Sequence, residues 1–205
     1  MRLRTKEEAI KVIYKCAQMY KENLSNKCVL FATAEDGKVI TFESLFLPQN
    51  FKHLTGVHSR VSGADFFGLV IRNKLSPSVI ELADDGTTDL KLDILPQLMS
   101  IHKTARMVGD YDNSRSLFIA DKIAGTVTAA MGFIHTMNYY LPQSALKSDV
   151  RDITLKATRH RVIAIFVKNR NDALYNELSY IASGISIGDK VFDSIRCRLD
   201  LRDTK

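Results

Sequence analysis

The sequence predicts an α+β fold in which N-terminal helices are followed by a mostly antiparallel β-sheet. Apolar residues recur at helical spacing in the first half of the 205-residue chain, whereas the second half holds short runs rich in β-branched and aromatic residues. The connections between those runs are of hairpin length, and no internal repeat or low-complexity linker interrupts the chain. We therefore expect one domain over residues 1–205.

The first half predicts a helix, a hairpin and further helices. Thr5 and Glu8 have the spacing of a capping box at the start of an amphipathic run that ends near residue 24. Two strand-like runs flank Asp36-Gly37, a strong hairpin signal. Ser62 is placed to cap a second helix. A third helical region covers "SPSVIELA" and, after Asp85-Gly86, residues 87–105, where Pro96 should end or kink one segment.

The second half predicts strands. Strand character is present in "ARMVGD", "SLFIAD" and "GTVTAAMGFI", and the run "RVIAIFV" is nearly continuous in apolar residues, as in a buried central strand. The tail, residues 184–205, has too weak a pattern for any element to be assigned.

Composition limits the class of protein. A hydrophobic content of 45% allows a sizeable core without disulfides, and Cys16, Cys28 and Cys197 are odd in number and widely spaced. No apolar run approaches the roughly 18 to 20 residues that span a bilayer, so we expect a cytoplasmic protein that does not contact a membrane. A net charge of +6 and a pI near 9.2 favour nucleic-acid partners.

The motifs of the common enzyme classes are absent, so any chemistry must use dispersed residues. There is no P-loop, GxSxG, HExxH or dinucleotide-binding glycine pattern. Asp84-Asp85 is typical of a turn, and Asp89 and Asp93 have no evident partners for a two-metal site. Histidine is the side chain that titrates near neutral pH, which draws attention to His53 in "NFKHLTGV". Taken alone, His53 is more readily interpreted as a hydrogen-bonded residue in a turn.

Several basic and hydroxylic residues lie at strand edges or just after strands. Each one alone is typical of a solvated surface or a helix cap. Together they would line one face of a sheet, where they would stabilise charge on a phosphate without any cofactor. The set is Lys122, Thr126, Ser144, Lys147 and Arg161.

Seven stretches, taken in order, resemble a known family. They are "FKHLTGV", "ADFFGLVIRNKLS", "DGTTDLKLDILPQLMSI", "ARMVGDYDNSRS", "DKIAGTVTAAMGF", "LPQSALKSDVR" and "RVIAIFVKN". This order is similar to the fourth phage- and mobile-element-associated clade of the barnase–EndoU–colicin–RelE-like (BECR) nuclease superfamily. The resemblance covers about residues 5–180. It implies an α+β fold with the active face on a curved antiparallel sheet of at least four strands.

The resemblance also implies roles for individual residues. His53 would be a general acid or base, Thr55 a phosphate or hydroxyl contact, and Gly56 a point of close backbone approach. Lys122 and Arg161 would neutralise transition-state charge, and the remaining substrate contacts would be Thr126, Ser144, Lys147 and Arg151. This chain departs from the pattern at Ala130, where a cysteine is expected.

Characterised members of the superfamily are mostly metal-independent ribonucleases in which the ribose 2′-hydroxyl attacks the adjacent phosphate. The resemblance therefore implies a toxin-like, phage-encoded endoribonuclease that needs no metal or other cofactor. A non-catalytic module that binds nucleic acid, a phage protein or an immunity protein on the same fold is the alternative. A nucleotide-dependent transferase such as an ADP-ribosyltransferase is a third possibility, but no glutamate stands in a suitable motif. The oligomeric state is left open.

Overall fold

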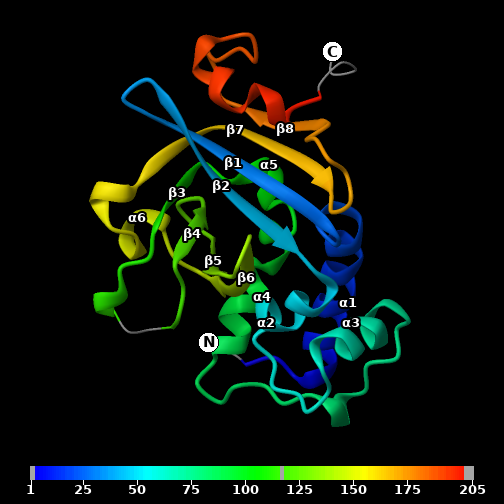
Figure 1. The fold of residues 1–205 in the computed structure, drawn as a ribbon. Coiled ribbons are helices and arrows are strands. Elements are labelled where there is room, and N and C mark those ends of the chain that lie inside the picture. Colours follow the sequence, from blue (N-terminus) through cyan, green and yellow to red (C-terminus); the bar gives the residue numbers. More distant parts are fainter. Residues whose placement is uncertain (1–2, 116–117, 201–205) are drawn as a thin grey trace.

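The fold is a β-barrel packed between N-terminal helices and a C-terminal segment (Figure 1). The structure is a computed structural model that describes residues 3–115 and 118–200. The strands are β1 (Lys27–Glu35), β2 (Lys38–Phe46), β3 (Met107–Asp110), β4 (Lys122–Gly125), β5 (Ala130–His135), β6 (Tyr140–Leu146), β7 (His160–Asn169) and β8 (Glu177–Ile181).

The α-helices are α1 (Lys6–Asn23), α2 (Phe51–Thr55), α3 (Gly63–Ile71), α4 (Thr87–Leu98), α5 (Ile101–Thr104) and α6 (Val150–Ile153). Short 3₁₀ helices lie at Pro48–Asn50, Pro77–Val79, Asn113–Arg115, Lys156–Thr158 and Lys190–Arg198. Among these residues, no helix is both long enough and apolar enough to cross a membrane.

Local sequence signals explain the first elements. The Thr5 hydroxyl accepts a hydrogen bond from the Glu8 amide, and the Glu8 carboxylate accepts one from the Thr5 amide, so the predicted capping box starts α1. Asp36 and Gly37 both have positive φ, at 49° and 75°, as the tight turn between β1 and β2 requires. The Ser62 hydroxyl caps α3 by accepting from the amide of Asp65, as predicted.

The sheet closes on itself. The strand order is β1-β2-β6-β5-β4-β3-β7-β8, and β1 also pairs with β7. Every pairing is antiparallel except that of β2 with β6, which is parallel and rests on the single pair Ser44 and Tyr140. The predicted α+β class and mostly antiparallel, curved sheet are confirmed, and the curvature extends to a closed barrel. Helices α2 and α4 pack against β6 beside its weakly paired seam with β2.

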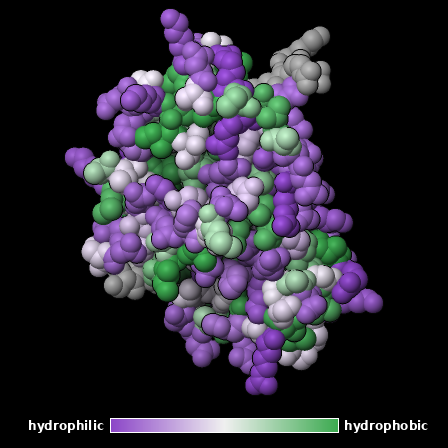
Figure 2. Space-filling view, viewed as in Figure 1, coloured by the Kyte–Doolittle hydropathy of each residue, from purple (hydrophilic) through white to green (hydrophobic). Residues whose placement is uncertain are grey.

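Alternation along the central strands separates two cores. In β1, Val29 and Phe31 point into the core shared with the helices, whereas Leu30 and Ala32 point to the opposite face. The predicted buried strand, β7, likewise has apolar side chains on both faces and pairs with β1, β3 and β8. Aromatic rings fill the barrel interior, with Phe42 and Phe133 at 4.9 Å between centroids. Hydrophilic residues cover most of the face in Figure 2, and the hydrophobic ones form small separate groups.

The tail that no sequence pattern assigned covers the outer face of β1 and β7. Phe192 and Ile195 of the 3₁₀ segment Lys190–Arg198 pack there against Phe166. Glu43 of β2 ties this segment down, because its carboxylate accepts from the Tyr175 hydroxyl and pairs with the Arg198 guanidinium. Figure 1 shows this C-terminal segment and helices α1 to α4 on opposite sides of the β1–β2 hairpin. Residues 201–205 of the tail lie outside the described chain.

Two strand predictions need correction. The run "SLFIAD" was expected to be a strand, but in its described part, residues 118–121, only Asp121 bonds to a strand, through its amide to the Phe133 carbonyl of β5. Its apolar side chains cover the outer sheet face instead: the Phe118 ring lies 4.3 Å from that of Tyr111. Ser116 and Leu117 lie outside the described residues. The run "GTVTAAMGFI" yields only β5, because Thr126 donates its amide to the Ala129 carbonyl and forms the β4–β5 turn.

Buried His102 in α5 predicts a loss of stability in acid. Its side chain is buried, Nδ1 has no hydrogen-bond partner, and burial lowers its pKa from 6.5 to about 4. The unfolded chain therefore binds a proton between pH 6.5 and 4 that the folded chain does not, so stability falls as pH decreases through this window. Acidification from pH 7 to 4 should cost about 3 kcal/mol through this group.

Urea unfolding of the wild type, His102→Leu and His135→Leu at pH 7 and pH 4 measures this effect. His135 is an exposed histidine, so His135→Leu is the matched control. His102→Leu should remove about 3 kcal/mol of the pH dependence. Equal acid sensitivity in all three proteins would show that His102 is not responsible.

Candidate active site

The backbone around Gly56 determines where His53 lies. His53 belongs to the short helix α2, which ends where Gly56 adopts a positive φ of 71°. The Thr55 hydroxyl donates to the Lys52 carbonyl at 2.7 Å and accepts from the Val57 amide at 3.3 Å, which stabilises this helix end. The Gly56 carbonyl accepts from the Thr88 hydroxyl at 2.8 Å and thereby ties α2 to α4. Thr55 has no exposed surface, so its contacts are internal to the protein.

His53 opens into a cavity of about 440 Å³ between α2 and the start of α4. We call this cavity the α2–α4 pocket. Its lining is rich in cationic and hydroxylic groups and includes one carboxylate. The lining residues are Lys52, His53, Gly56, Val57, His58, Ser59, Ala83, Asp85, Thr87 and Lys91.

The two lysines that line the pocket differ in their contacts. The Lys52 ammonium donates to the carbonyls of Ser59 and Val61, at 2.7 and 2.6 Å, and so holds the 59–61 loop that forms one wall. Lys91 has no hydrogen-bond acceptor or ion-pair partner within the described part of the chain. Its stem crosses Gly56 so closely that a Cβ added there would lie 2.6 Å from the Lys91 Cδ.

The electrostatics favour a neutral imidazole in this pocket. Burial, followed by the nearby charges of Lys52 and Lys91, lowers the pKa of His53 below 6.5. Burial also lowers the pKa of Lys91 below 10.5. His53 makes no hydrogen bond to any described residue, so the imidazole is free to exchange a proton with a bound molecule.

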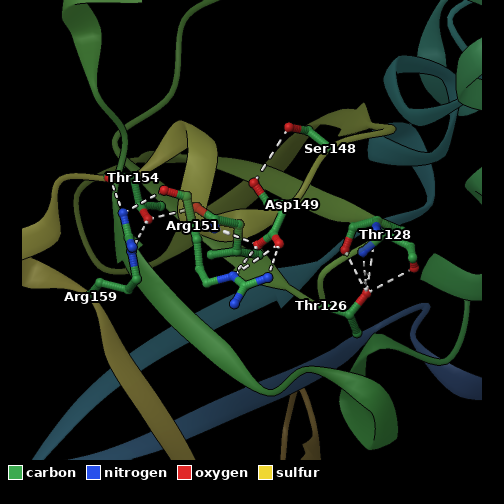
Figure 3. Close-up of polar contacts among 9 residues, drawn as sticks. Thr126, Thr128, Ser148, Asp149, Arg151, Thr154 and Arg159 are labelled. Atoms are coloured by element: carbon green, nitrogen blue, oxygen red, sulfur yellow. Dashed lines mark hydrogen bonds and ion pairs between the residues drawn. The ribbon is translucent and has the colours of Figure 1, made fainter.

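The predicted substrate contacts after β4 and β6 form a second group. The Thr126 hydroxyl accepts from the Gln97 side-chain amide at 3.1 Å. The Arg151 guanidinium pairs with the Asp149 carboxylate at 2.6 Å (Figure 3). Lys147 pairs with Asp93 of α4 at 2.8 Å. Each predicted contact here already has an internal partner.

Helix α4 separates this second group from the α2–α4 pocket. Lys91, which lines the pocket, and Asp93, which pairs with Lys147, are two positions apart and so leave the helix about 200° apart. The same helix therefore presents Lys91 to the histidine side and Asp93 to the Lys147 side.

The predicted catalytic residues His53, Lys122 and Arg161 do not share one face. Lys122 lies opposite Phe133, which belongs to the barrel interior, and pairs with Asp110. Arg161 lies opposite Met107, which packs on the outer cluster around Tyr111. Opposed residues of an antiparallel pair share a face and successive residues alternate. Lys122 and Arg161 thus leave opposite faces of the sheet, while His53 stands on a helix.

Two further positions serve packing. Ser144 of β6 is 6% exposed and lies opposite Gly132 of β5. Ala130, where the resemblance implies a cysteine, is fully buried in the outer cluster beneath α6. In the described ranges no group of three His, Cys, Asp or Glu side chains has the arrangement of a metal site.

Comparison with known families decides the class of protein. The sequence profile of the phage-Barnase-EndoU-ColicinE5/D-RelE like nuclease 4 family matches residues 12–184. The chain belongs to this family. No curated protein and no solved structure matches the chain. The matched region contains the α2–α4 pocket and strands β1 to β8, and among the described elements only the 3₁₀ segment Lys190–Arg198 follows it.

The sequence patterns did not identify Lys91 as a site residue of this family member. Its signal lay in the periodicity of α4, because Lys91 falls between Thr88 and Leu95 on the stripe of the helix that faces inward. A lysine in an otherwise buried stripe needs either a partner or a function, since burial disfavours its charge.

Gly56→Ala should lower both stability and any activity that depends on the pocket. An alanine at φ 71° costs about 1 to 2 kcal/mol, and its Cβ would displace the Lys91 stem. Gly37→Ala is the matched control, because Gly37 also has positive φ, at 75°, and nothing lies within 4 Å of an added Cβ. Urea unfolding should show similar losses in both variants, and only Gly56→Ala should reduce RNA cleavage. Equal cleavage rates in the two variants would show that the position of the Lys91 stem does not matter for the reaction.

Proposed function

We propose that the chain is a metal-independent endoribonuclease whose reaction takes place in the α2–α4 pocket. The observation that carries this proposal is the pairing of a free histidine of lowered pKa with a half-buried lysine that has no internal partner. A general base must be unprotonated at working pH, and a phosphate needs a cation that is not already neutralised. Membership of a nuclease family supports a nucleic-acid substrate.

The chemistry needs only this chain's own side chains. Neutral His53 removes the proton of a ribose 2′-hydroxyl, whose oxygen then bonds to the adjacent phosphorus. The bond from phosphorus to the 5′-oxygen breaks, and a 2′,3′-cyclic phosphate is formed. The leaving 5′-oxygen takes a proton from water, and the His53 imidazolium then returns its proton to the hydroxide that is left. The Lys91 ammonium balances the charge that accumulates on the phosphate oxygens.

The remaining predicted residues act around this centre in the proposal. Gly56 lets the Lys91 stem cross the backbone closely, and Thr55 holds the helix end that carries His53. Lys122, Arg161, Thr126, Ser144, Lys147 and Arg151 lie on the barrel and its loops, where the exposed members would contact more distant parts of an RNA.

Purified protein, incubated with labelled RNA and with labelled DNA, tests the proposal. Each reaction is run with EDTA and with added magnesium, alongside His53→Ala. RNA cleavage that is insensitive to EDTA and lost in His53→Ala is expected. Cleavage that requires magnesium, or that proceeds equally on DNA, would contradict the mechanism.

One observation favours a non-catalytic binding module instead. Lys122, Lys147 and Arg151 are each paired with a carboxylate, and Lys122 and Arg161 lie on opposite faces, so the sheet offers no converging set of catalytic groups. Such a module would bind nucleic acid, a phage protein or an immunity protein. It predicts salt-dependent RNA affinity and no product in any of the buffers above.

A further inference from the structure

A second cavity, of about 550 Å³, adjoins the α2–α4 pocket. It lies between the 58–61 loop and the segment around the 3₁₀ helix Pro77–Val79, and we call it the loop pocket. Its lining residues are His58, Ser59, Arg60, Val61, Ser78, Val79 and Glu81. His58 and Ser59 line both cavities, so the two adjoin, and we call them together the groove. Each volume falls in the range of about 300 to 1,000 Å³ that is usual for ligand sites.

Hydrogen bonds to the backbone fix the walls of the loop pocket. His58 and Glu81 exchange backbone hydrogen bonds of 2.9 Å in both directions. The Lys52 ammonium binds the carbonyls of Ser59 and Val61, and the Ser59 hydroxyl accepts from the Val61 amide. The groove is therefore preformed, which lowers the entropic cost of binding.

The two pockets differ in chemistry. The α2–α4 pocket presents two histidines and Lys91, which has no partner among the described residues, and these suit a phosphate. Its one carboxylate, Asp85, accepts a hydrogen bond from the Thr87 amide at 2.9 Å. The loop pocket presents the Glu81 carboxylate, which repels a phosphate but accepts hydrogen bonds from N–H and O–H groups. Val61 and Val79 supply an apolar wall against which the flat face of a base can pack. Arg60 is exposed and has no ion-pair partner within the described ranges.

We infer that the loop pocket is a nucleoside subsite, which takes the nucleotide next to the one whose phosphate lies at His53 and Lys91. Arg60 then binds a backbone phosphate at the rim, and the Glu81 carboxylate accepts hydrogen bonds from the base or ribose. The inference rests on the proposed function and deepens it, because a groove with two adjacent units selects a single-stranded chain rather than a free mononucleotide. A paired base would not fit a pocket bounded on both sides by protein.

Binding of non-cleavable 2′-O-methyl ribodinucleotides, compared with ribonucleoside 3′-monophosphates, tests the subsite in solution. The variants are Arg60→Gln and Ser78→Ile, the second filling the cavity from an exposed position. Arg72→Gln is the control, since Arg72 is an exposed arginine that lines neither pocket. Both loop-pocket variants should weaken dinucleotide binding by about tenfold and leave mononucleotide binding unchanged. For a longer single strand, Arg60→Gln should also reduce the salt dependence of log K by about 0.7.

Two results would overturn the inference: dinucleotides that bind wild type no more tightly than mononucleotides, or equal dinucleotide affinity in wild type, Arg60→Gln and Ser78→Ile. Failure of the proposed function is recognised separately. If wild type cleaves no RNA but the two variants weaken dinucleotide binding, the subsite stands and the cleavage mechanism falls. If RNA is cleaved and neither variant changes dinucleotide binding, the mechanism stands and the subsite falls.

Discussion

His53→Ala is expected to reduce the rate of RNA cleavage by about 100- to 10,000-fold, the usual contribution of a general acid–base group. The reason is local: His53 shares the α2–α4 pocket with Lys91, which has no partner among the described residues, and the lowered pKa of His53 keeps its imidazole neutral near pH 7. Single-turnover cleavage of a labelled RNA at saturating protein measures the chemical step without the contribution of substrate binding.

His135→Ala is the matched control for this prediction. His135 is an exposed histidine at the end of β5 and lines neither cavity of the groove. The His135→Ala protein should cleave RNA at the wild-type rate. Equal rates for His53→Ala and wild type would remove His53 from the reaction, whatever the product.

The pH–rate profile tests the roles proposed for His53 and Lys91. A neutral base is required, so the rate should rise with pH through a midpoint below 6.5, the ordinary pKa of histidine. A charged Lys91 is also required, so the rate should fall again through a midpoint below 10.5. Lys91→Arg should move the upper limb to higher pH, because the guanidinium keeps its proton. An upper limb that does not move would show that Lys91 does not control it.

Phe133→Ala is expected to be the most destabilising single change, at about 3 to 5 kcal/mol. Phe133 has no exposed surface and lies in the barrel interior, where its ring centroid is within 6.4 Å of those of Phe31, Phe42 and Phe46. Removal of the ring leaves a cavity that the closed strands cannot easily collapse around. Urea unfolding gives the free energy of unfolding and its slope.

Met137→Ala is the control for this loss. Met137 lies in the β5–β6 turn and is 96% exposed, so its replacement should change stability by less than about 0.5 kcal/mol. A Phe133→Ala protein as stable as Met137→Ala would mean that the barrel interior is not packed as described.

Much of the fold could be predicted from local signals. Thr5 with Glu8, Asp36 with Gly37, and Ser62 each act on the backbone within a few residues, and each formed the predicted cap or turn. Pro96 did not end the helix before it: it lies inside α4, which continues to Leu98. Closure of the barrel could not be predicted, because the pairing of β1 with β7 joins residues more than 100 positions apart.

The elements that were missed have weak or contrary patterns. β6 contains Pro142, which cannot donate to a ladder and argues against a strand, and the chain accommodates it where the register with β5 shifts. The 3₁₀ segment Lys190–Arg198 holds only Phe192 and Ile195 as buried anchors, too few to produce a clear period. Residues 118–121 are the opposite case. Their apolar character predicted a strand, but the apolar residues cover the sheet without forming one of its strands.

For the candidate site, the sequence indicated the histidine but not its neighbours. Motif order drew attention to His53, Thr55 and Gly56, which do lie together at the end of α2. It also grouped them with Lys122 and Arg161, which the alternation of the strands sends to opposite faces. The neighbour that does meet His53 is Lys91, which is brought there by the bond between Thr88 and Gly56.

The most direct test of the proposed function is the chemical identity of the ends formed when the purified protein cleaves a defined RNA in EDTA. Attack by the 2′-hydroxyl predicts a 2′,3′-cyclic phosphate on one fragment and a 5′-hydroxyl on the other. It also predicts no cleavage at a position whose 2′-hydroxyl is replaced by hydrogen. Fragments with a 3′-hydroxyl and a 5′-phosphate, or no fragments at all, would contradict it.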